Sequence, residues 1–482
     1  MSLGARIVRL TAGNGSAQVL QLVSLPLLSR LFEPGHFGAY VLFVGAAAVL
    51  SVFAGLRYEA AIILPRRENS AAALSALVLW LAATTAIAVG AGTLVVTLAS
   101  ESGTARTTAL VTGVGLLCVL PASALQRVFA GWLARASRFG AVGMMQFTAV
   151  AATLTLQVLL VNAGVPGFAA LVAGHVGGQV LAALVFARGL GSAWRRLHLV
   201  LLRRRHLVAV AARYARFPKF MLPYGLSSAL RERLVHFSVG AFAGSGALGQ
   251  FAMAARVAGA PNSFLYQGVS PVMYAHAARA SRPEVSRDGA AIMELLAMLL
   301  VPAFIFLAVD GPRWLDLLLG DSWSGTGRYV SLLAAPYLAL ALTSWLDRLF
   351  DVYRTQDRAL LLDVAFTVTL VSTVSIAAAR GGGHAAAATF AVVFTAYELV
   401  WTAITYRLHG LRLRMLRRPA ALVVVLGSAS AAVLAGLTAM MDPTPRAVLF
   451  FFLAGLSVLG YLRFGGGRHR IRMLFGAPVN TG

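Results

Sequence analysis

Charged side chains are scarce in this chain of 482 residues: Asp, Glu, Lys and Arg make up 12% of it, whereas hydrophobic residues make up 59%. Soluble proteins carry about 25% charged residues. The composition therefore excludes an ordinary soluble protein and indicates a polytopic membrane protein. Cys118 is the only cysteine, which excludes an intrachain disulfide. Lys219 is the only lysine, so the formal charge of +24 comes almost entirely from arginine.

Motifs of several enzyme classes are also absent. The chain contains no P-loop, no HExxH, no GxSxG and no Cys/His cluster with metal-ligand spacing. We therefore expect no enzyme activity, no catalytic residue, no bound metal and no cofactor. Transport would have to be driven by an ion gradient, with proton or sodium coupling, or by consumption of the product on the far side.

Long apolar segments occupy most of the sequence. Windows of about 20 apolar residues, the length that crosses a bilayer, predict an all-α protein with fourteen transmembrane helices. The predicted segments are 11–31, 38–64, 71–99, 107–134, 139–162, 165–187, 218–243, 248–275, 290–309, 327–352, 359–379, 384–406, 420–440 and 445–462.

Basic residues between the segments predict the side on which each loop lies. With a cytoplasmic N-terminus, every cytoplasmic loop is richer in bases than its neighbours on the other side, and the C-terminus is also cytoplasmic. This explains the net charge more simply than a nucleic-acid surface, so we expect no nucleic-acid partner. The opposite loops contain only Arg30, Arg106, Arg313, Arg328, Arg380 and Arg446.

The longest basic connector divides the predicted helices into groups. Six segments precede it, which predicts an N-terminal six-helix lobe (1–187), a basic cytoplasmic connector (188–217) and a C-terminal six-helix lobe (218–408). Two additional transmembrane helices and a basic cytoplasmic tail occupy 409–482. The stretch Phe32–Tyr40 recurs in outline at Ala243–Phe251. Each copy lies in the first extracytoplasmic turn of its half, as in parallel repeats, although small residues are common in such turns.

Two charged residues lie well inside the second predicted segment. Arg57 precedes Pro65-Arg66-Arg67 by eight residues, which places it about 12 Å from the membrane edge on a helix. A charge at this depth is costly unless it faces protein or water. Glu59 is two residues away and would point to another face of the helix, so we expect no pair between Arg57 and Glu59.

The stretch around these charges resembles a known family. Its characteristic residues are Pro26, Ser29-Arg30-Leu31-Phe32, Pro34, Phe37-Gly38, Tyr40, Leu56-Arg57-Tyr58-Glu59 and Pro65. They are similar to the N-terminal signature of polysaccharide biosynthesis membrane proteins. These are Wzx-type O-antigen or exopolysaccharide flippases of the multidrug/oligosaccharidyl-lipid/polysaccharide exporter superfamily. The specific match covers the first 65 residues, and beyond it the similarity lies in span number and loop charge.

The resemblance implies a fold and an activity. The fold would have two six-helix lobes around a central cavity, as in multidrug exporters of the superfamily. The activity would be translocation of undecaprenyl-pyrophosphate-linked glycans across the bacterial cytoplasmic membrane, with membrane lipids and other polysaccharide assembly proteins as partners. The alternatives are an ion-coupled multidrug exporter and, in another class, a membrane-embedded glycan polymerase or ligase. A scaffold without transport would not need charges inside the membrane.

Arginines inside the segments are the candidate substrate-binding residues. Guanidinium groups bind phosphate oxygens bidentately and stay charged at physiological pH, so a cationic lumen suits a pyrophosphate. The alternative is structural ion pairing between helices. The candidates are Arg57, Arg127, Arg231, Arg233 and Arg256, partly offset by Glu59, Glu232 and Glu398.

Polar residues in the first segment are candidates for lining the cavity. Asn14, Gln18 and Gln21 follow one helix face at i, i+4 and i+7. Pro26 then interrupts the hydrogen-bond ladder, which membrane helices tolerate where neighbours or cavity water satisfy the freed carbonyl. The same stripe would serve equally well to join neighbouring helices by hydrogen bonds.

Several titratable residues are candidates for ion or proton coupling. Asp347 and Asp351 share a helix face, where mutual repulsion would favour proton binding by one of them; pairing with Arg354 at a solvated helix end is the alternative. Glu398 lies deeper in its segment and is the alternative candidate for the proton site. His175 lies near the middle of its segment, where it serves either as a proton relay or as a packing residue.

Overall fold

The computed structural model describes residues 15–65, 67–136, 138–187 and 204–464, and within these ranges every regular element is a helix. The chain divides into two compact units. Unit 1 contains 1–252, 319–323 and 378–383, and unit 2 contains 253–318, 324–377 and 384–482. The all-helical fold predicted from composition is confirmed.

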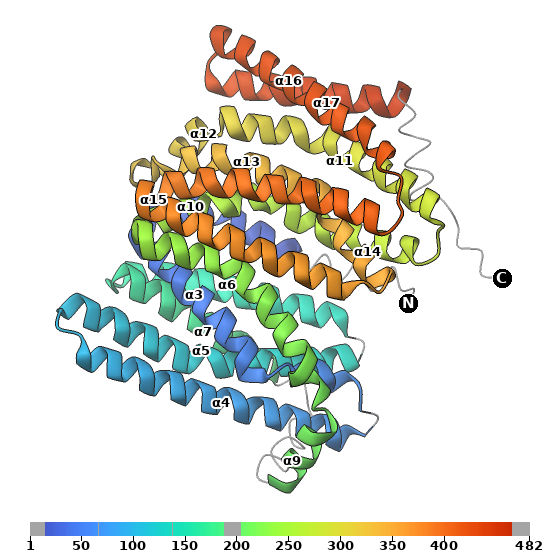
Figure 1. Cartoon of the computed structure of the whole chain (residues 1–482). Helices are drawn as coiled ribbons and strands as arrows, with labels where there is room; N and C mark the ends of the chain where they lie inside the picture. The colour runs from blue at the N-terminus through green and yellow to red at the C-terminus, as the bar shows by residue number, and fades with distance from the viewer. Residues whose placement is uncertain (1–14, 66, 137, 188–203, 465–482) are drawn as a thin grey trace. The chain divides into compact units, whose positions relative to one another are not determined.

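Unit 1 is a bundle of long apolar helices, of which α4 and α5 lie side by side, as do α6 and α7 (Figure 1). Ser102 begins α5 by accepting a hydrogen bond from the Ala105 N–H at 3.2 Å, which satisfies a free helix-end donor. The elements are α2 (Leu25–Leu31), α3 (Pro34–Gly55), η1 (Tyr58–Ile63), α4 (Glu68–Ala99), α5 (Gly103–Arg135), α6 (Phe139–Asn162), α7 (Gly167–Ala187), α9 (Arg204–Arg213), η3 (Phe217–Met221) and the first half of α10 (Leu222–Ala277).

Unit 2 contains the second half of α10 and the helices that follow it. Ser281 begins α11 through a capping box with Glu284, whose Oε2 accepts from the Ser281 N–H at 2.8 Å. The elements are α11 (Arg282–Val309), α12 (Gly311–Leu319), η4 (Asp321–Trp323, in unit 1), α13 (Thr326–Thr343), η5 (Ser344–Leu346), α14 (Asp347–Val352), α15 (Gln356–Leu408), η6 (Leu413–Leu416), α16 (Arg417–Met440) and α17 (Pro443–Phe464).

Two glycines interrupt helices that are otherwise continuous. Gly244 in α10 has φ 88° and Gly382 in α15 has φ 70°, a region that residues with a Cβ rarely adopt. The predicted boundaries at 243/248 and 379/384 bracket these breaks. In the described ranges, nine helices are long and apolar enough to cross a membrane. The count of fourteen spans stays a prediction, and residues 188–203 of the basic connector lie outside the described ranges.

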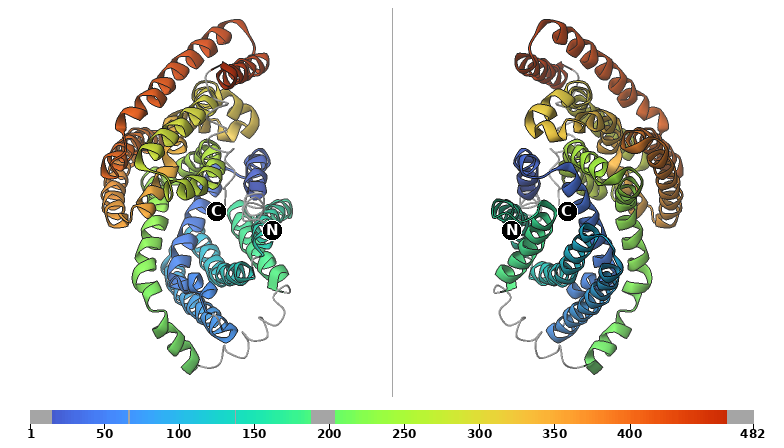
Figure 2. Two further views of the ribbon diagram at one scale, coloured as in Figure 1. Left: turned by 90° about the vertical axis from the view of Figure 1, so that its right-hand side faces the viewer. Right: turned by 90° about the vertical axis from the view of Figure 1, so that its left-hand side faces the viewer.

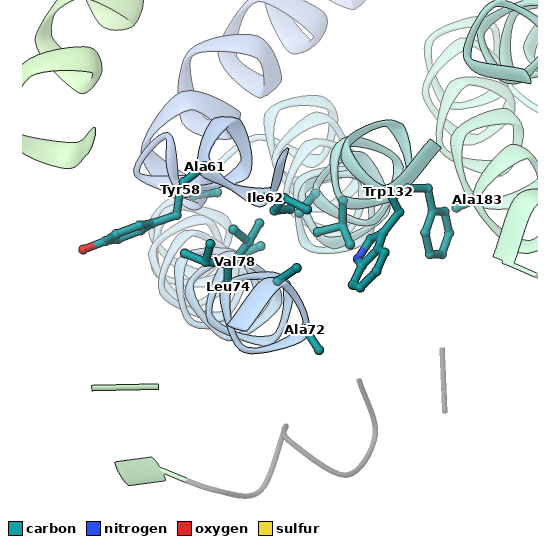
Figure 3. Packing of buried hydrophobic residues seen from close by; sticks show 14 of the residues in the cluster. Tyr58, Ala61, Ile62, Ala72, Leu74, Val78, Trp132 and Ala183 are labelled. Carbon is teal, nitrogen blue, oxygen red and sulfur yellow. The ribbon is translucent and has the colours of Figure 1, made fainter. Parts of the chain in front are cut away.

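The core of unit 1 packs around η1. Ile62 is fully buried together with Leu74 and Val78 of α4, and Figure 3 shows these side chains with Trp132 of α5 beside them. The Tyr58 hydroxyl donates to the carbonyl of a residue on α9 at 3.2 Å. This packing fixes the short helix that follows α3.

The two similar stretches of the sequence contact each other within unit 1. A Cβ built on Gly38 would overlap with the Ser245 carbonyl, and one built on Gly249 would overlap with the Pro34 carbonyl. In the alignment of the two stretches, Pro34 corresponds to Ser245 and Gly38 to Gly249. Each contact is therefore the counterpart of the other, as expected where two repeats meet across a pseudo-twofold axis.

The chain between α12 and α13 also joins unit 1. Trp323 is fully buried, and its indole N–H donates to the carbonyls of Ser29 at 2.9 Å and Phe32 at 3.1 Å. The indole lies edge-on to the Phe37 ring, with the centroids 5.6 Å apart. The turn between α2 and α3 therefore holds a residue from nearly 300 positions further along the chain.

In unit 2, a buried ion pair ties α17 to the end of α11. Arg446 donates to Asp310 from Nε at 3.0 Å and from Nη2 at 2.6 Å, and the two side chains are 1% and 2% exposed. Helices α16 and α17, the red helices in Figure 2, follow each other along the chain and contact one another. The sequence places Arg446 in a loop, and its partner was not predicted.

Candidate functional site

The end of α3 sets the position of the first candidate charge. The helix stops at Gly55, and Leu56 and Arg57 both adopt left-handed backbone conformations, with φ of 44° and 62°. Such conformations are rare in residues with a Cβ and mark functional or strained positions. The predicted helix 38–64 is therefore wrong over its last third, where η1 replaces it.

This break changes the relation between Arg57 and Glu59. Arg57 Nη1 lies 3.8 Å from Glu59 Oε1, so the expectation that these residues cannot pair is wrong. That expectation assumed regular helical geometry, whereas the left-handed turn brings the two side chains together. Gly55 leaves the space for the carboxylate, because a Cβ there would lie 2.5 Å from Glu59 Oε2.

Arg127 of α5 completes the cluster. Its Nη2 donates to the Ser51 carbonyl of α3 at 3.1 Å, and the Ser51 and Ser123 hydroxyls lie 3.1 Å apart. Arg127 is close enough to interact electrostatically with both Glu59 and Arg57. We call Arg57, Glu59 and Arg127 the arginine cluster.

The arginine cluster has more hydrogen-bonding capacity than it uses. Arg57 Nε, Arg127 Nε and Glu59 Oε2 are buried and have no hydrogen-bond partner among the described residues. Buried polar groups are nearly always satisfied by protein, water or ligand. Two guanidinium groups and one carboxylate leave one positive charge, so the cluster can accept an anion with donors already in place.

The other three candidate arginines all belong to α10. The stem of Arg233 packs at Gly45 of α3, where a Cβ would lie 3.5 Å from Arg233 Cδ. Arg256 is an exposed residue of unit 2. Arg231 and Glu232 belong to α10, but their side chains lie outside the part of the chain that the structure describes.

The polar stripe of the first segment is partly described. Asn14 lies outside the described residues. Gln18 is half-buried with an Oε1 that has no partner in the described chain, whereas Gln21 is exposed. The helix continues into α2, with Pro26 in its first turn. Their assignment as cavity-lining residues stays a prediction.

The candidate coupling residues are distributed between the units. In unit 2, Asp351 pairs with Arg348 at 3.5 Å, and Arg348 Nε also donates to the Ser270 hydroxyl at 3.0 Å. The anticipated partner, Arg354, adopts a left-handed conformation with φ 58° after α14. Asp347 begins α14.

Glu398 and His175 each lie within hydrogen-bonding distance of a hydroxyl group. Glu398 is 5% exposed, and its Oε2 lies 2.6 Å from Thr343 Oγ1. His175, in unit 1, lies with Nδ1 3.1 Å from the Tyr40 hydroxyl and against the Phe43 ring. Among the described residues, no group of three or more His, Cys, Asp or Glu side chains could hold a metal ion.

Comparison with known proteins identifies the fold. No curated protein matches the sequence. The lipid II flippase MurJ in an inward closed conformation is similar with a TM-score of 0.70 at 11% identity, over 94% of this chain and 99% of that one. An inward-facing multidrug resistance MATE family transporter of the MOP superfamily has a TM-score of 0.54 at 14% identity, over 86% of this chain and 94% of that one. A MOP superfamily transporter from Pyrococcus furiosus has a TM-score of 0.52 at 13% identity, over 86% of this chain and 96% of that one. The fold is therefore that of MOP superfamily transporters.

The sequence itself identifies the family. A family model described as "Polysaccharide biosynthesis protein" matches residues 27–327, which is more than half of the chain. The matched range includes α3, η1 and α5 and therefore all three residues of the arginine cluster. The resemblance seen in the stretch from Pro26 to Pro65 is confirmed: this chain belongs to the polysaccharide biosynthesis protein family.

Proposed function

We propose that this protein is a flippase that translocates undecaprenyl-pyrophosphate-linked oligosaccharide units across the bacterial cytoplasmic membrane for cell-surface polysaccharide synthesis. The observation that carries the proposal is the arginine cluster, in which the Nε donors of both half-buried arginines are buried and unpartnered among the described residues. Membership of the family and the transporter fold support it.

The chemistry of the cluster suits a pyrophosphate. Arg57 and Arg127 would donate to phosphate oxygens, and Arg231 and Arg233 of the same unit would supply further positive charge. Hydrogen bonds between guanidinium groups and phosphate are short and charge-assisted. The sugar and pyrophosphate would occupy the cationic cavity while the polyprenyl chain stays in the bilayer.

Translocation would follow alternating access, in which two lobes rock about a site near the middle of the membrane. The cluster contains two cations and one acid, which favours an anionic substrate. A multidrug exporter for cationic compounds would need the opposite balance of charge. A glycan polymerase or ligase would need an extracytoplasmic domain to hold its acceptor, and the segments between the predicted spans are short.

The experiment is translocation of a fluorescent undecaprenyl-pyrophosphate oligosaccharide in proteoliposomes, measured as protection of the label from a membrane-impermeant quencher. Wild type is compared with Arg57→Gln and Arg127→Gln. Each substitution removes a charged hydrogen-bond donor worth about 1.5–3 kcal/mol, so apparent affinity should fall about 10- to 150-fold. Arg231→Gln tests the third candidate.

Arg106→Gln is the matched control, because Arg106 is an exposed residue of the same helix as Arg127. It should translocate at the wild-type rate. Wild-type rates in Arg57→Gln and Arg127→Gln, at equal expression and thermal stability, would refute the cationic binding site. Failure of the wild type to move the lipid-linked glycan while it exports organic cations would refute the flippase assignment.

A further inference from the structure

The contacts of Glu398 on α15 indicate its protonation state. Its Oε2 lies 2.6 Å from Thr343 Oγ1 at the end of α13. The same hydroxyl oxygen lies 2.8 Å from the Ala339 carbonyl oxygen, one turn earlier in α13. Both separations are typical of O–H···O hydrogen bonds.

A threonine hydroxyl has one hydrogen to donate. The Ala339 carbonyl can only accept, so when Thr343 donates to it, the hydrogen between Thr343 and Glu398 has to come from the carboxyl group. With an ionised carboxylate, Thr343 would be the donor in both short contacts and would have to share its single hydrogen between them. Glu398 also lies inside a candidate membrane span, where a charged acid is costly. The geometry therefore fits a protonated Glu398 that donates to Thr343.

A row of buried polar atoms extends from Glu398 to the end of α15. Glu398, Thr402, Thr405 and His409 follow one another at intervals of four, three and four residues and therefore share one face. Thr402 is 8% exposed, Thr405 0% and His409 2%. Thr402 Oγ1, Thr405 Oγ1 and His409 Nδ1 have no hydrogen-bond partner among the described residues.

These unpartnered atoms provide sites for water. Buried waters in proteins bind polar groups that are otherwise unsatisfied, and the row spans about 16 Å at the rise of an α-helix. It ends at the connection after α15, where His409 Nε2 lies 2.9 Å from the Thr355 hydroxyl of the α14–α15 turn. Water along the row would link Glu398 to the medium at this end of the helix.

We propose that Glu398 is a proton-binding site and that the polar row exchanges its proton with the medium at the end of α15. The carboxylate takes a proton from a hydronium ion and releases water, and the reverse step returns the proton. Other acids on elements that pack in this part of unit 2 are Glu294 of α11 and Asp347 of α14. On α15 itself, Tyr406 and Arg407 lie between Glu398 and His409. Coupling of this proton to glycan movement rests on the proposed function, but the proton site itself does not.

The first test is infrared spectroscopy of the purified protein at neutral pH. The wild-type minus Glu398→Gln difference spectrum should contain the C=O stretching band of a buried carboxylic acid. Asp357→Asn is the matched control, since Asp357 is an exposed acid of the same helix, and its difference spectrum should lack this band. A difference spectrum of Glu398→Gln without an acid band would overturn the proposal.

Variants of the hydroxyl partner keep the test decisive if Glu398→Gln folds poorly. Thr343→Val removes the acceptor and should shift the acid band to higher frequency, whereas Thr343→Ser should retain the wild-type position. Thr369→Val is the control, because Thr369 is exposed on α15 and makes the same bond to a carbonyl one turn earlier. An unshifted band in Thr343→Val would contradict the assigned hydrogen bond.

The second test measures coupling in proteoliposomes with and without a pH gradient. Glu398→Gln should lose the acceleration that the gradient gives the wild type. Full acceleration in Glu398→Gln would overturn the coupling. A wild type that retains the acid band but moves no lipid-linked glycan would refute the proposed function and leave the proton site intact, so the two failures are distinguishable.

Discussion

The buried pair between Asp310 and Arg446 gives a quantitative prediction about the C-terminal helices. Both atoms of the Arg446 fork bond to one carboxylate, and the two side chains are 1% and 2% exposed. Removing one member of such a pair leaves the other charge buried, which costs about 3–5 kcal/mol. We expect Asp310→Asn to lower the free energy of unfolding by this amount, because the amide accepts a hydrogen bond but does not neutralise Arg446.

Removal of Arg446 should cost less than removal of its partner. Arg313 Nη1 lies 3.7 Å from Asp310 and is 57% exposed, so it can move toward the carboxylate when Arg446 is absent. We expect Arg446→Met to lose about 3 kcal/mol, the lower end of the range for breaking a buried pair. The double variant Asp310→Leu/Arg446→Met should recover to within about 1 kcal/mol of wild type, because it leaves no buried charge.

Unfolding equilibria in mixed detergent micelles would measure these changes, with Arg313→Met as the exposed control. A second readout is local. A protease site inserted after α15 would allow α16–α17 to be cut free, and the fragment should remain bound in wild type but dissociate in Asp310→Asn. Equal stability of wild type and Asp310→Asn would refute the assignment of an anchoring role to the pair. A double variant no more stable than the single ones would refute the charge-burial argument.

Three further perturbations test other parts of the fold. Gly38→Ala should lose about 1–3 kcal/mol by overpacking against the Ser245 backbone, whereas Gly35→Ala, where the nearest atom is 3.8 Å away, should be neutral in the same thermal assay. Trp323→Phe removes a donor to two carbonyls and should cost about 1–3 kcal/mol in the same assay. Burial lowers the pKa of His409 below its ordinary value of 6.5, so the unfolded chain binds a proton first as the pH falls. Unfolding free energy should hold above pH 6.5 and decline below it, and His409→Asn should flatten that decline.

Periodicity and charge predicted the fold well because they act over whole segments. A run of about twenty apolar residues predicts a membrane helix whatever residues flank it. The breaks at Gly244 and Gly382 were located to within a few residues because glycine clusters separate the runs. The end of α3 was missed for the opposite reason: Leu56 and Arg57 are ordinary helix formers. Their left-handed conformations lead into η1, which packs against α4 and α5, and such tertiary contacts leave no local signal in the sequence.

Contacts between distant residues could not be read from the sequence. Asp310 and Arg446 are 136 positions apart, and Arg446 followed a proline-rich turn that is typical of a loop. The Arg57–Glu59 pair was excluded because the i, i+2 spacing separates side chains on a helix. That separation holds on a helix, but the backbone at Leu56 and Arg57 is left-handed. The hydroxyl partner of Glu398 was equally hidden, since Thr343 belongs to another helix.

The stretch from Pro26 to Pro65, which carries the family resemblance, has two structural roles. Its first half supplies the backbone carbonyl of Pro34 and the missing side chain of Gly38, on which the paired contact with the second copy of the turn depends. Its second half ends α3 early and turns Arg57 back toward Glu59 and Arg127. Both halves belong to α3 and its flanks, so a tilt of this single helix would move the repeat contact and the arginine cluster together. A substrate anion bound at the cluster would thus act directly on the element that forms the contact between the repeats.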